Sequence, residues 1–218
     1  MDVALHTKRL NLIPMTDQEL AETMERETDP HMKQAYGEML SACRAHPEDR
    51  LFCTQWRIRD EEGATVGGVS FKGPAVNGAV ELGYGIEPAY RGNGYAGEAA
   101  EILIKWAFSR DGVYWVEAEA DPGNAASLAI LEKLGFTQTG TGREGLRFET
   151  ERPFPGNCFK LLCLGMCFGA AIGISIGKLN IALPIGSCLG LLWGNTLDKR
   201  DQSKRAALRT ARKQNSDS

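Results

Sequence analysis

The chain has 218 residues, of which 43% are hydrophobic, and its formal net charge is −3. That small value hides a charge separation, because residues 1–157 carry 16 basic and 25 acidic side chains whereas residues 158–218 carry 9 and 3. An acidic globular part argues against nucleic acid as a partner and favours a cationic substrate, since charge of one sign concentrates the opposite sign.

The cysteines predict neither a disulfide framework nor a metal centre. The six thiols form no C-x-x-C pair, and no histidine lies near Cys163 and Cys167. The opening residues MDVALHTKRL lack the apolar core of a secretory signal. We therefore expect the first domain to stay, with reduced cysteines, in the compartment where it is made.

The first half of the chain predicts a mixture of helices and antiparallel strands. A strand is expected at 9–14, followed by a helix to about Glu27 that opens with the capping-box spacing of Thr16 and Glu19. A second helix is expected at 31–44. The pattern then predicts a hairpin with strands at 51–59 and up to Phe71, a turn at 60–63, and a further strand at 79–86.

The next segments predict a helix after the glycine-containing loop at 89–97, ending before Gly112. A strand at 113–120, a helix from Asn124 to Gly135 and a last strand at 146–150 follow. This order indicates a mixed α+β layer rather than a run of identical βαβ units.

The loop contains Gly92, Gly94 and Gly97 in the spacing G-x-G-x-x-G, which has three interpretations. A nicotinamide dinucleotide site would need this loop after the first strand, although Glu117 and Glu119 would suit the ribose. A tight turn without a ligand would not account for the small residues beside Arg91. A site for another phosphate group is the third interpretation, and we favour it.

The stretches IEPAYRGNGYAGEA and NAASLAILEKLGF, with TKRLNLIPMT and ELGYGIEP, carry a specific resemblance. Residues 7–150 resemble the GNAT superfamily of acyl-CoA-dependent N-acetyltransferases, most of all the Rim-type ribosomal-protein N-terminal acetyltransferases and their small-molecule relatives. The resemblance implies an α+β fold with a mixed, mostly antiparallel sheet flanked by helices. It also implies acetyl-CoA as cosubstrate, no metal, and direct attack in a ternary complex by the amine of a protein N-terminus or a small molecule.

The same resemblance assigns the cofactor-binding residues. Small residues let the backbone approach a pyrophosphate, and the free N–H groups of a first helical turn receive its charge. The resemblance implies that a bulge in the strand before the loop splays it from the next strand, and Gly83 and Gly85 supply the weakened strand that this needs. The backbone of Ile86 is then expected to meet the pantetheine or thioester, and Asn124 to contact the pantetheine arm. Asn124 is equally explained as a helix cap. The residues expected at the phosphates are Arg91, Gly92, Asn93, Gly94, Tyr95 and Ala96.

Three residues are candidates for the chemistry. Glu119 is the first choice for the general base and Glu81 the second, with solvated strand residues as the alternative interpretation of both. By resemblance, Ser127 lies near the CoA sulfur and donates a proton to the thiolate, because Leu131 occupies the position of the tyrosine used in other branches. A hydroxyl in a first helical turn explains Ser127 equally well. Thr139 stands where some Rim-type members carry a glutamate.

The C-terminal part lies outside the resemblance. Residues 161–195 contain one charge, Lys178, and glycines spaced by four in two sets. They predict a helical hairpin with arms 161–177 and 181–195 whose glycine stripes pack together as in membrane contacts. Each arm is shorter than a usual span, so the hairpin either thins the bilayer or inserts without crossing it.

Basic residues flank this segment, mainly between Lys199 and Lys213. They favour an anionic lipid surface and, by the positive-inside rule, both ends in the cytoplasm. A buried apolar hairpin that completes a core or a homo-oligomer is the soluble alternative.

These observations predict a chain in four parts. They are an acetyltransferase domain at 1–152, a linker at 153–160, a glycine-zipper membrane hairpin at 161–196 and a basic tail at 197–218. We expect a membrane-associated N-acetyltransferase whose catalytic domain lies in the cytoplasm. The alternative is a membrane-inserting or oligomerising protein whose non-catalytic head senses CoA.

Overall fold

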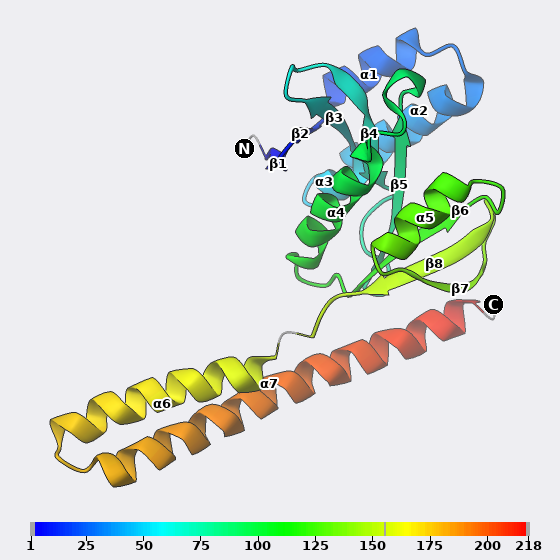
Figure 1. Cartoon of the computed structure of the whole chain (residues 1–218). Coiled ribbons are helices and arrows are strands. Elements are labelled where there is room, and N and C mark those ends of the chain that lie inside the picture. The colour runs from blue at the N-terminus through cyan, green and yellow to red at the C-terminus, as the bar shows by residue number, and fades with distance from the viewer. Residues whose placement is uncertain (1–2, 155, 217–218) are drawn as a thin grey trace. The chain divides into compact units, whose positions relative to one another are not determined.

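The computed structural model describes residues 3–154 and 156–216. The chain divides into two compact units, residues 1–152 and residues 153–218. The first unit holds the sheet and its helices, and the second consists of two long helices (Figure 1).

The first unit is built on one eight-stranded sheet with the order β1-β2-β3-β4-β5-β6-β8-β7. All neighbouring strands are antiparallel except β5 and β6, which run parallel. The expected mixed, mostly antiparallel sheet is therefore confirmed. The strands are β1 (Leu5–His6), β2 (Leu10–Pro14), β3 (Gln55–Asp60), β4 (Thr65–Phe71), β5 (Ala79–Ile86), β6 (Trp115–Ala120), β7 (Thr137–Thr141) and β8 (Leu146–Glu151).

Six helical segments accompany the sheet: α1 (Asp17–Arg26), α2 (Pro30–Ala45), α3 (Arg50–Cys53), the 3-10 turn η1 (Pro88–Tyr90), α4 (Tyr95–Phe108) and α5 (Ala125–Lys133). The apolar side of α4, including Leu103 and Trp106, packs into the main core with Trp56 and Phe71. A second, smaller core lies between α1 and α2. The α4 helix is thus held firmly against the strands that precede it.

Local sequence signals place the helix ends. Thr16 and Glu19 form the predicted capping box of α1, with the Glu19 N–H donating to Thr16 Oγ1 at 3.2 Å. Asn124 caps α5 by accepting a hydrogen bond from the Ser127 N–H at 3.1 Å. Gly135 follows the end of α5 with a φ of 77°, a conformation that favours glycine at a helix terminus.

The structure differs from the sequence prediction at several segments. The strand expected from Leu51 is wrong at its start, because residues 50–53 form α3 and the strand begins at Gln55. Trp56 Nε1 donates to the Leu51 carbonyl at 3.0 Å, which fixes this turn. The strands β1 and β7 were not expected; both are edge strands, β1 of two residues and β7 of polar composition, and β8 runs between β6 and β7.

The second unit consists of α6 (Asn157–Ser175) and α7 (Leu179–Ser216), which run side by side in opposite directions (Figure 1). Their glycines lie where the backbones meet. A Cβ on Gly165 would overlap the Gly186 carbonyl, and one on Gly190 would overlap the Leu161 carbonyl. Any larger residue at these positions would therefore push the helices apart.

The second helix does not end near residue 195 as expected but continues through the basic segment to Ser216. Arginine, lysine and alanine are good helix formers, and no glycine follows Gly194 to stop it. Asp198, which is 9% exposed, accepts hydrogen bonds from the Asn157 N–H at 3.1 Å and the Cys158 N–H at 3.0 Å. One helix therefore caps the other, and this cap fixes their register.

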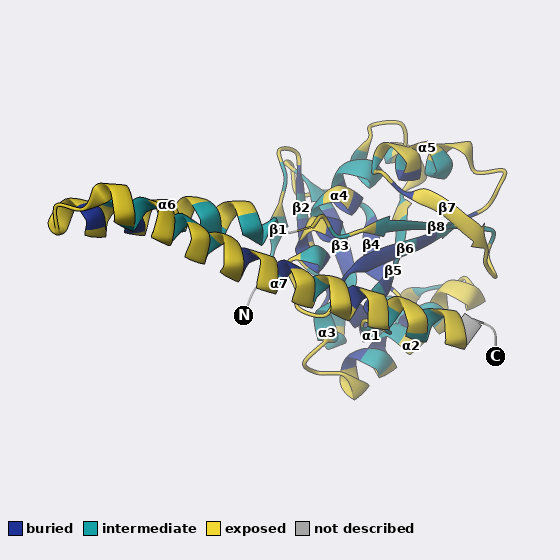
Figure 2. Ribbon diagram, turned by 90° about the horizontal axis from the view of Figure 1, so that it is seen from below, coloured by how far each residue is buried: buried dark blue, intermediate teal, exposed yellow. Residues whose placement is uncertain are grey.

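Large apolar side chains cover the outside of this helix pair, where most positions of α6 and of the first half of α7 are exposed (Figure 2). Within the described part of the chain, α6 is the one helix long and apolar enough to cross a membrane by length and composition, with a mean hydropathy of 1.8. Of its most apolar window, 11% is buried.

Candidate active site

The site begins at the loop before α4. Gly92 and Gly94 have φ values of 81° and 77°, a left-handed conformation that side chains disfavour. Gly94 is the N-cap of α4, and no side chain forms a capping hydrogen bond there. The first-turn N–H groups of Tyr95, Ala96 and Gly97 have no partner within their own helix by geometry, so this end is suited to an anion.

A residue near the N-terminus, Arg9, forms an ion pair that supports this loop. Arg9 contacts the Glu98 carboxylate at 2.7 Å and donates through Nη1 to the Asn93 carbonyl at 3.1 Å. Thr7 Oγ1 donates to the same carboxylate at 2.5 Å. Burial acts to raise the pKa of Glu98, but the hydrogen bonds from Thr7 and Arg9 outweigh it and hold the pKa below its ordinary value. Glu98 is therefore ionised at neutral pH and ties the turn between β1 and β2 to α4.

Side chains of the loop also hold the loop together. Arg91 Nε donates to the Ile86 carbonyl at 3.1 Å, and Asn93 Nδ2 donates to the Tyr90 carbonyl at 3.0 Å. These bonds keep the Arg91 guanidinium next to the end of β5. A fixed cation therefore lies beside the open end of α4.

The two parallel strands separate next to this loop. The pairing of β5 with β6 runs from Ala79 and Trp115 to Leu82 and Ala118, whereas β5 stays paired with β4 as far as Ile86. The β4 and β5 register continues without a shift. Residues 83–86 thus lose their β6 partner, as the expected splay requires, but the expected bulge is absent because their pairing with β4 continues to Ile86.

A pocket of about 570 Å³ lies on one face of this separation. Tyr84, from β5, and Ser127, from α5, meet in it with their hydroxyl oxygens 2.8 Å apart. Burial raises the pKa of Tyr84, while the hydrogen bond with Ser127 opposes that shift. The phenol therefore keeps its proton at neutral pH. The pocket is lined by Tyr84, Gly85, Ile86, Tyr90, Arg91, Gly92, Gly94, Tyr95, Ala96, Asn124, Ala126, Ser127 and Ile130.

The two candidate bases lie in a different pocket. Side chains alternate along a strand, and Glu81 and Tyr84 differ in parity, so they point to opposite faces of β5. Glu119 has the parity of Glu117, the strand neighbour of Glu81, and shares the face of Glu81. Both glutamates line a second pocket of about 590 Å³.

The carboxylates in this second pocket already have partners. Lys72 Nζ contacts Glu81 at 2.6 Å and Glu144 at 2.9 Å. Glu119, with a side chain 7% exposed, accepts from the Glu144 N–H at 2.8 Å, and its other oxygen lies 3.7 Å from Arg147 Nε. Burial acts to lower the pKa of Lys72, but the bonds to Glu81 and Glu144 outweigh it and raise the pKa. Lys72 is therefore charged.

The structure thus brings most of the predicted cofactor-binding residues together around one pocket: Ile86, Arg91, Gly92, Gly94, Tyr95, Ala96, Asn124 and Ser127. Asn93 does not line it; its side chain bonds to the Tyr90 carbonyl. The two glutamates lie on the other face of the sheet. Leu131 is fully buried in the core and offers no proton. Sequence reasoning missed Tyr84, Lys72 and the Arg9–Glu98 pair. The alternation along 79–86 could have revealed Tyr84, whereas Arg9 and Glu98 are far apart in sequence and give no local signal.

No group of three or more histidine, cysteine, aspartate or glutamate side chains suited to a metal ion occurs among residues 3–154 and 156–216. The N-terminal end of α4 is suited to an anionic ligand, and next to it β5 and β6 separate between the two pockets.

Comparison with known proteins gives matches across the first unit. A model of the acetyltransferase (GNAT) domain matches residues 9–137. An uncharacterized N-acetyltransferase of Bacillus subtilis, YjdG, is 40% identical over 80 residues, which are 36% of this chain and 48% of that protein. The chain thus spans about half the length of this relative.

Solved structures share the fold of the same unit. An acetyltransferase from Agrobacterium tumefaciens is 21% identical, with a TM-score of 0.55, over 69% of this chain and 95% of that one. A ribosomal-protein-S5-alanine acetyltransferase from Vibrio fischeri is 17% identical, with a TM-score of 0.54, over 70% and 98%. These likenesses are at the level of the fold.

Proposed function

The chain belongs to the GNAT family of acetyltransferases, and on this basis we propose that it transfers the acetyl group of acetyl-CoA to a primary amine. One observation carries the proposal: the uncapped end of α4 and the unpaired part of β5 line the same pocket. A charged diphosphate needs the first feature and a thioester arm needs the second.

The proposed binding mode uses the main chain more than side chains. The N–H groups of Tyr95, Ala96 and Gly97 receive the diphosphate, with Arg91 as a neighbouring cation. The pantetheine arm follows the free edge of β5 between Gly83 and Ile86, where main-chain groups have no β6 partner. Asn124 keeps α5 in place and so holds Ser127 at the pocket.

The reaction we propose is direct. The amine nitrogen forms a bond to the acetyl carbon, the carbon–sulfur bond breaks, and the CoA thiolate takes up a proton. Ser127 Oγ supplies that proton and regains one from solvent, and the Tyr84 hydroxyl, 2.8 Å away, fixes its orientation. No covalent link to the protein is needed.

The attacking amine must first lose a proton, and the two glutamates are suited to accept it, directly or through water. Glu119 lies one residue past the last β5–β6 pair, closer in register to the separation than Glu81 is. We therefore keep Glu119 as the first candidate for the base. Glu81, held by Lys72, is the second.

The test uses the full chain. Calorimetry should show binding of acetyl-CoA, and release of free thiol should depend on an added amine. Ser127→Ala should lower kcat by about 10²- to 10⁴-fold if Ser127 is the general acid, with little change in acetyl-CoA affinity. Absence of binding at millimolar acetyl-CoA would overturn the proposal.

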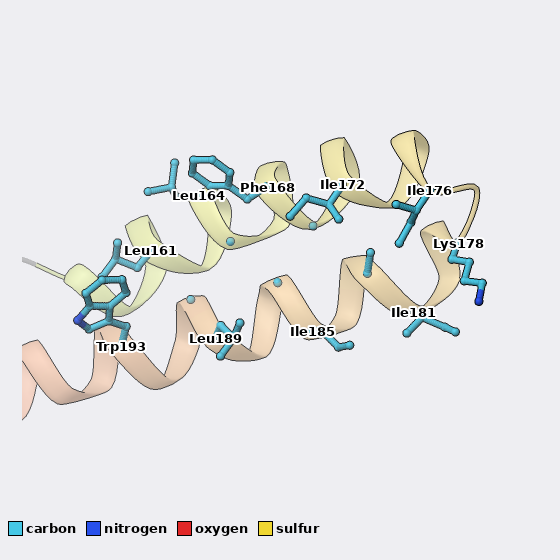
Figure 3. A pocket seen from close by; sticks show the side chains of 15 residues that line it. Leu161, Leu164, Phe168, Ile172, Ile176, Lys178, Ile181, Ile185, Leu189 and Trp193 are labelled. Atoms are coloured by element: carbon cyan, nitrogen blue, oxygen red, sulfur yellow. The ribbon is translucent and has the colours of Figure 1, made fainter.

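For the second unit, we propose attachment to an anionic membrane surface. Exposed apolar side chains line the groove between the helices, with a volume of about 450 Å³ (Figure 3). Helix α6 is about 28 Å long at 1.5 Å per residue, close to the thickness of a hydrocarbon core, and the apolar part of α7 is about 24 Å. The basic residues of α7 would then meet anionic headgroups on the cytoplasmic side. The labelled groove residues include Leu161, Leu164, Phe168, Ile172, Ile176, Ile181, Ile185, Leu189 and Trp193.

Vesicle flotation tests this attachment. The full chain should float with vesicles that contain anionic lipid, and Ile172→Asp, which puts a charge on a side chain 55% exposed on α6, should reduce the bound fraction. Gln18→Asp, at an exposed position on α1 of the first unit, is the matched control and should leave the bound fraction unchanged. Equal recovery of all three proteins in the unbound fraction would contradict the attachment.

A further inference from the structure

The pocket on the glutamate face of the sheet contains charges of both signs in equal number. Its charged side chains come from β5, β6, β8, the residue after β4, and the turn between β7 and β8. They are Lys72, Glu81, Glu119, Arg143, Glu144 and Arg147. Three are acidic and three basic, so the pocket is locally neutral although residues 1–157 as a whole are acidic.

The acidic side of the pocket is suited to an ammonium group. Glu81 and Glu119 project from neighbouring strands toward the same face, with side chains 26% and 7% exposed. A partly buried carboxylate attracts a cation more strongly than a solvated one does, because less water screens the charge.

The basic side has unused hydrogen-bonding capacity. Arg147 forms ion pairs with Glu117 at 3.5 Å and Glu119 at 3.7 Å, yet its buried Nε makes no hydrogen bond among the described residues. Such a donor is usually satisfied, and a planar guanidinium suits a carboxylate or phosphate oxygen. Arg143 lies exposed in the turn before β8 and lines the same pocket.

A polycation fits this arrangement poorly. An amine with a second positive charge would meet Lys72, Arg143 and Arg147, and like charges at close range repel. An amine that also carries an anionic group places each of its charges opposite the other sign. The pocket itself thus argues against the purely cationic substrate that the net charge of the domain favoured.

Resting on the proposed acetyl transfer, we propose that the acceptor is a small zwitterionic amine that carries a carboxylate or a phosphate. Its ammonium lies toward Glu81 and Glu119, and its anion toward Arg143 and Arg147. The shared chemistry covers a free amino acid, a free amino-phosphate, and the aminoethyl phosphate headgroup of a lipid.

The experiment compares acceptors that differ in the anionic group alone, with the full chain, acetyl-CoA and thiol release as the readout. Lysine is compared with cadaverine, and phosphoethanolamine with ethanolamine. We expect kcat/KM to be at least about tenfold higher for the anionic member of a pair, the size of one charge-assisted hydrogen bond. Vesicles containing phosphatidylethanolamine form a separate arm, read by acetylation of the lipid.

Arg143→Gln removes one cation from an exposed turn, where a folding defect is not expected. It should lower kcat/KM for the anionic acceptor about tenfold and leave kcat/KM for the matched acceptor without the anionic group unchanged. Lys105→Gln on α4, which removes an exposed charge paired with Glu101, is the matched control.

The outcomes are distinct. Faster transfer to lysine and phosphoethanolamine than to cadaverine and ethanolamine supports the inference and identifies a free acceptor. Transfer to the phosphatidylethanolamine vesicles alone supports it and identifies a lipid headgroup. Equal or faster transfer to cadaverine and ethanolamine, with acetyl transfer intact, overturns the inference but not the proposed function. Binding of acetyl-CoA without transfer to any amine overturns both.

Discussion

The contact between Tyr84 and Ser127 gives the sharpest prediction about mechanism. Tyr84→Phe removes one hydroxyl and keeps the ring that lines the pocket. The lost hydrogen bond of 2.8 Å is between neutral groups, for which a net value of about 0.5–1.5 kcal/mol is typical. If that energy orients Ser127 in the transition state, kcat falls about 2- to 12-fold while KM for acetyl-CoA stays unchanged.

The double variant separates a positioning role from an independent one. If Tyr84 acts through Ser127, adding Tyr84→Phe to Ser127→Ala costs nothing further, because the partner hydroxyl is already gone. Tyr36→Phe, which alters a buried tyrosine of the other core, should leave kcat unchanged.

The assay is steady-state thiol release at saturating amine, with acetyl-CoA varied, together with circular dichroism to confirm folding. A multiplicative loss in the double variant would refute the positioning role. So would an unchanged kcat in Tyr84→Phe alone.

Three further predictions concern stability and the second unit. Because the pKa of Glu98 is lowered, its ionised form stabilises the fold above the ordinary carboxyl pKa of 4.5, and this contribution is lost as pH falls through the lowered value. The free energy of unfolding in urea should therefore depend less on acid pH in Glu98→Gln. Identical pH profiles of the two proteins would contradict this. Asp198→Ala should destabilise the α6–α7 pair by about 0.5–2 kcal/mol, measured by thermal unfolding, because two helix N–H groups lose their acceptor. Anionic vesicles should slow the alkylation of three cysteines that are exposed without lipid, Cys163, Cys167 and Cys188. Cys53, whose pKa is raised to about 11 by burial, should react slowly with and without vesicles. Equal alkylation rates of the three exposed cysteines in both conditions would argue against insertion.

The parts of the fold that could be predicted are those set by nearby residues. The capping box at Thr16 and Glu19, the cap at Asn124 and the stop at Gly135 each depend on a few neighbours. The edge strand β7 could not be predicted, because the polar segment TQTGT has no apolar alternation and gains its partner from β8.

The site divides in the same way. The glycine loop was recognisable because its spacing is local, whereas the register of β5 with β6 was not predicted, because a strand pattern does not fix which residues pair. The Arg9–Glu98 pair and the equal charges of the glutamate pocket depend on residues brought together by the sheet. The length of α7 was missed because the change from apolar to basic side chains indicates a different environment for the side chains but does not end the helix.

Amide hydrogen exchange at residues 95–97, with and without acetyl-CoA, tests the central claim most directly. If the first turn of α4 holds the diphosphate, these N–H groups gain hydrogen bonds, and their exchange should slow on binding while the first turn of α1 stays unchanged. Bound acetyl-CoA with unaltered exchange at Tyr95, Ala96 and Gly97 would contradict the account.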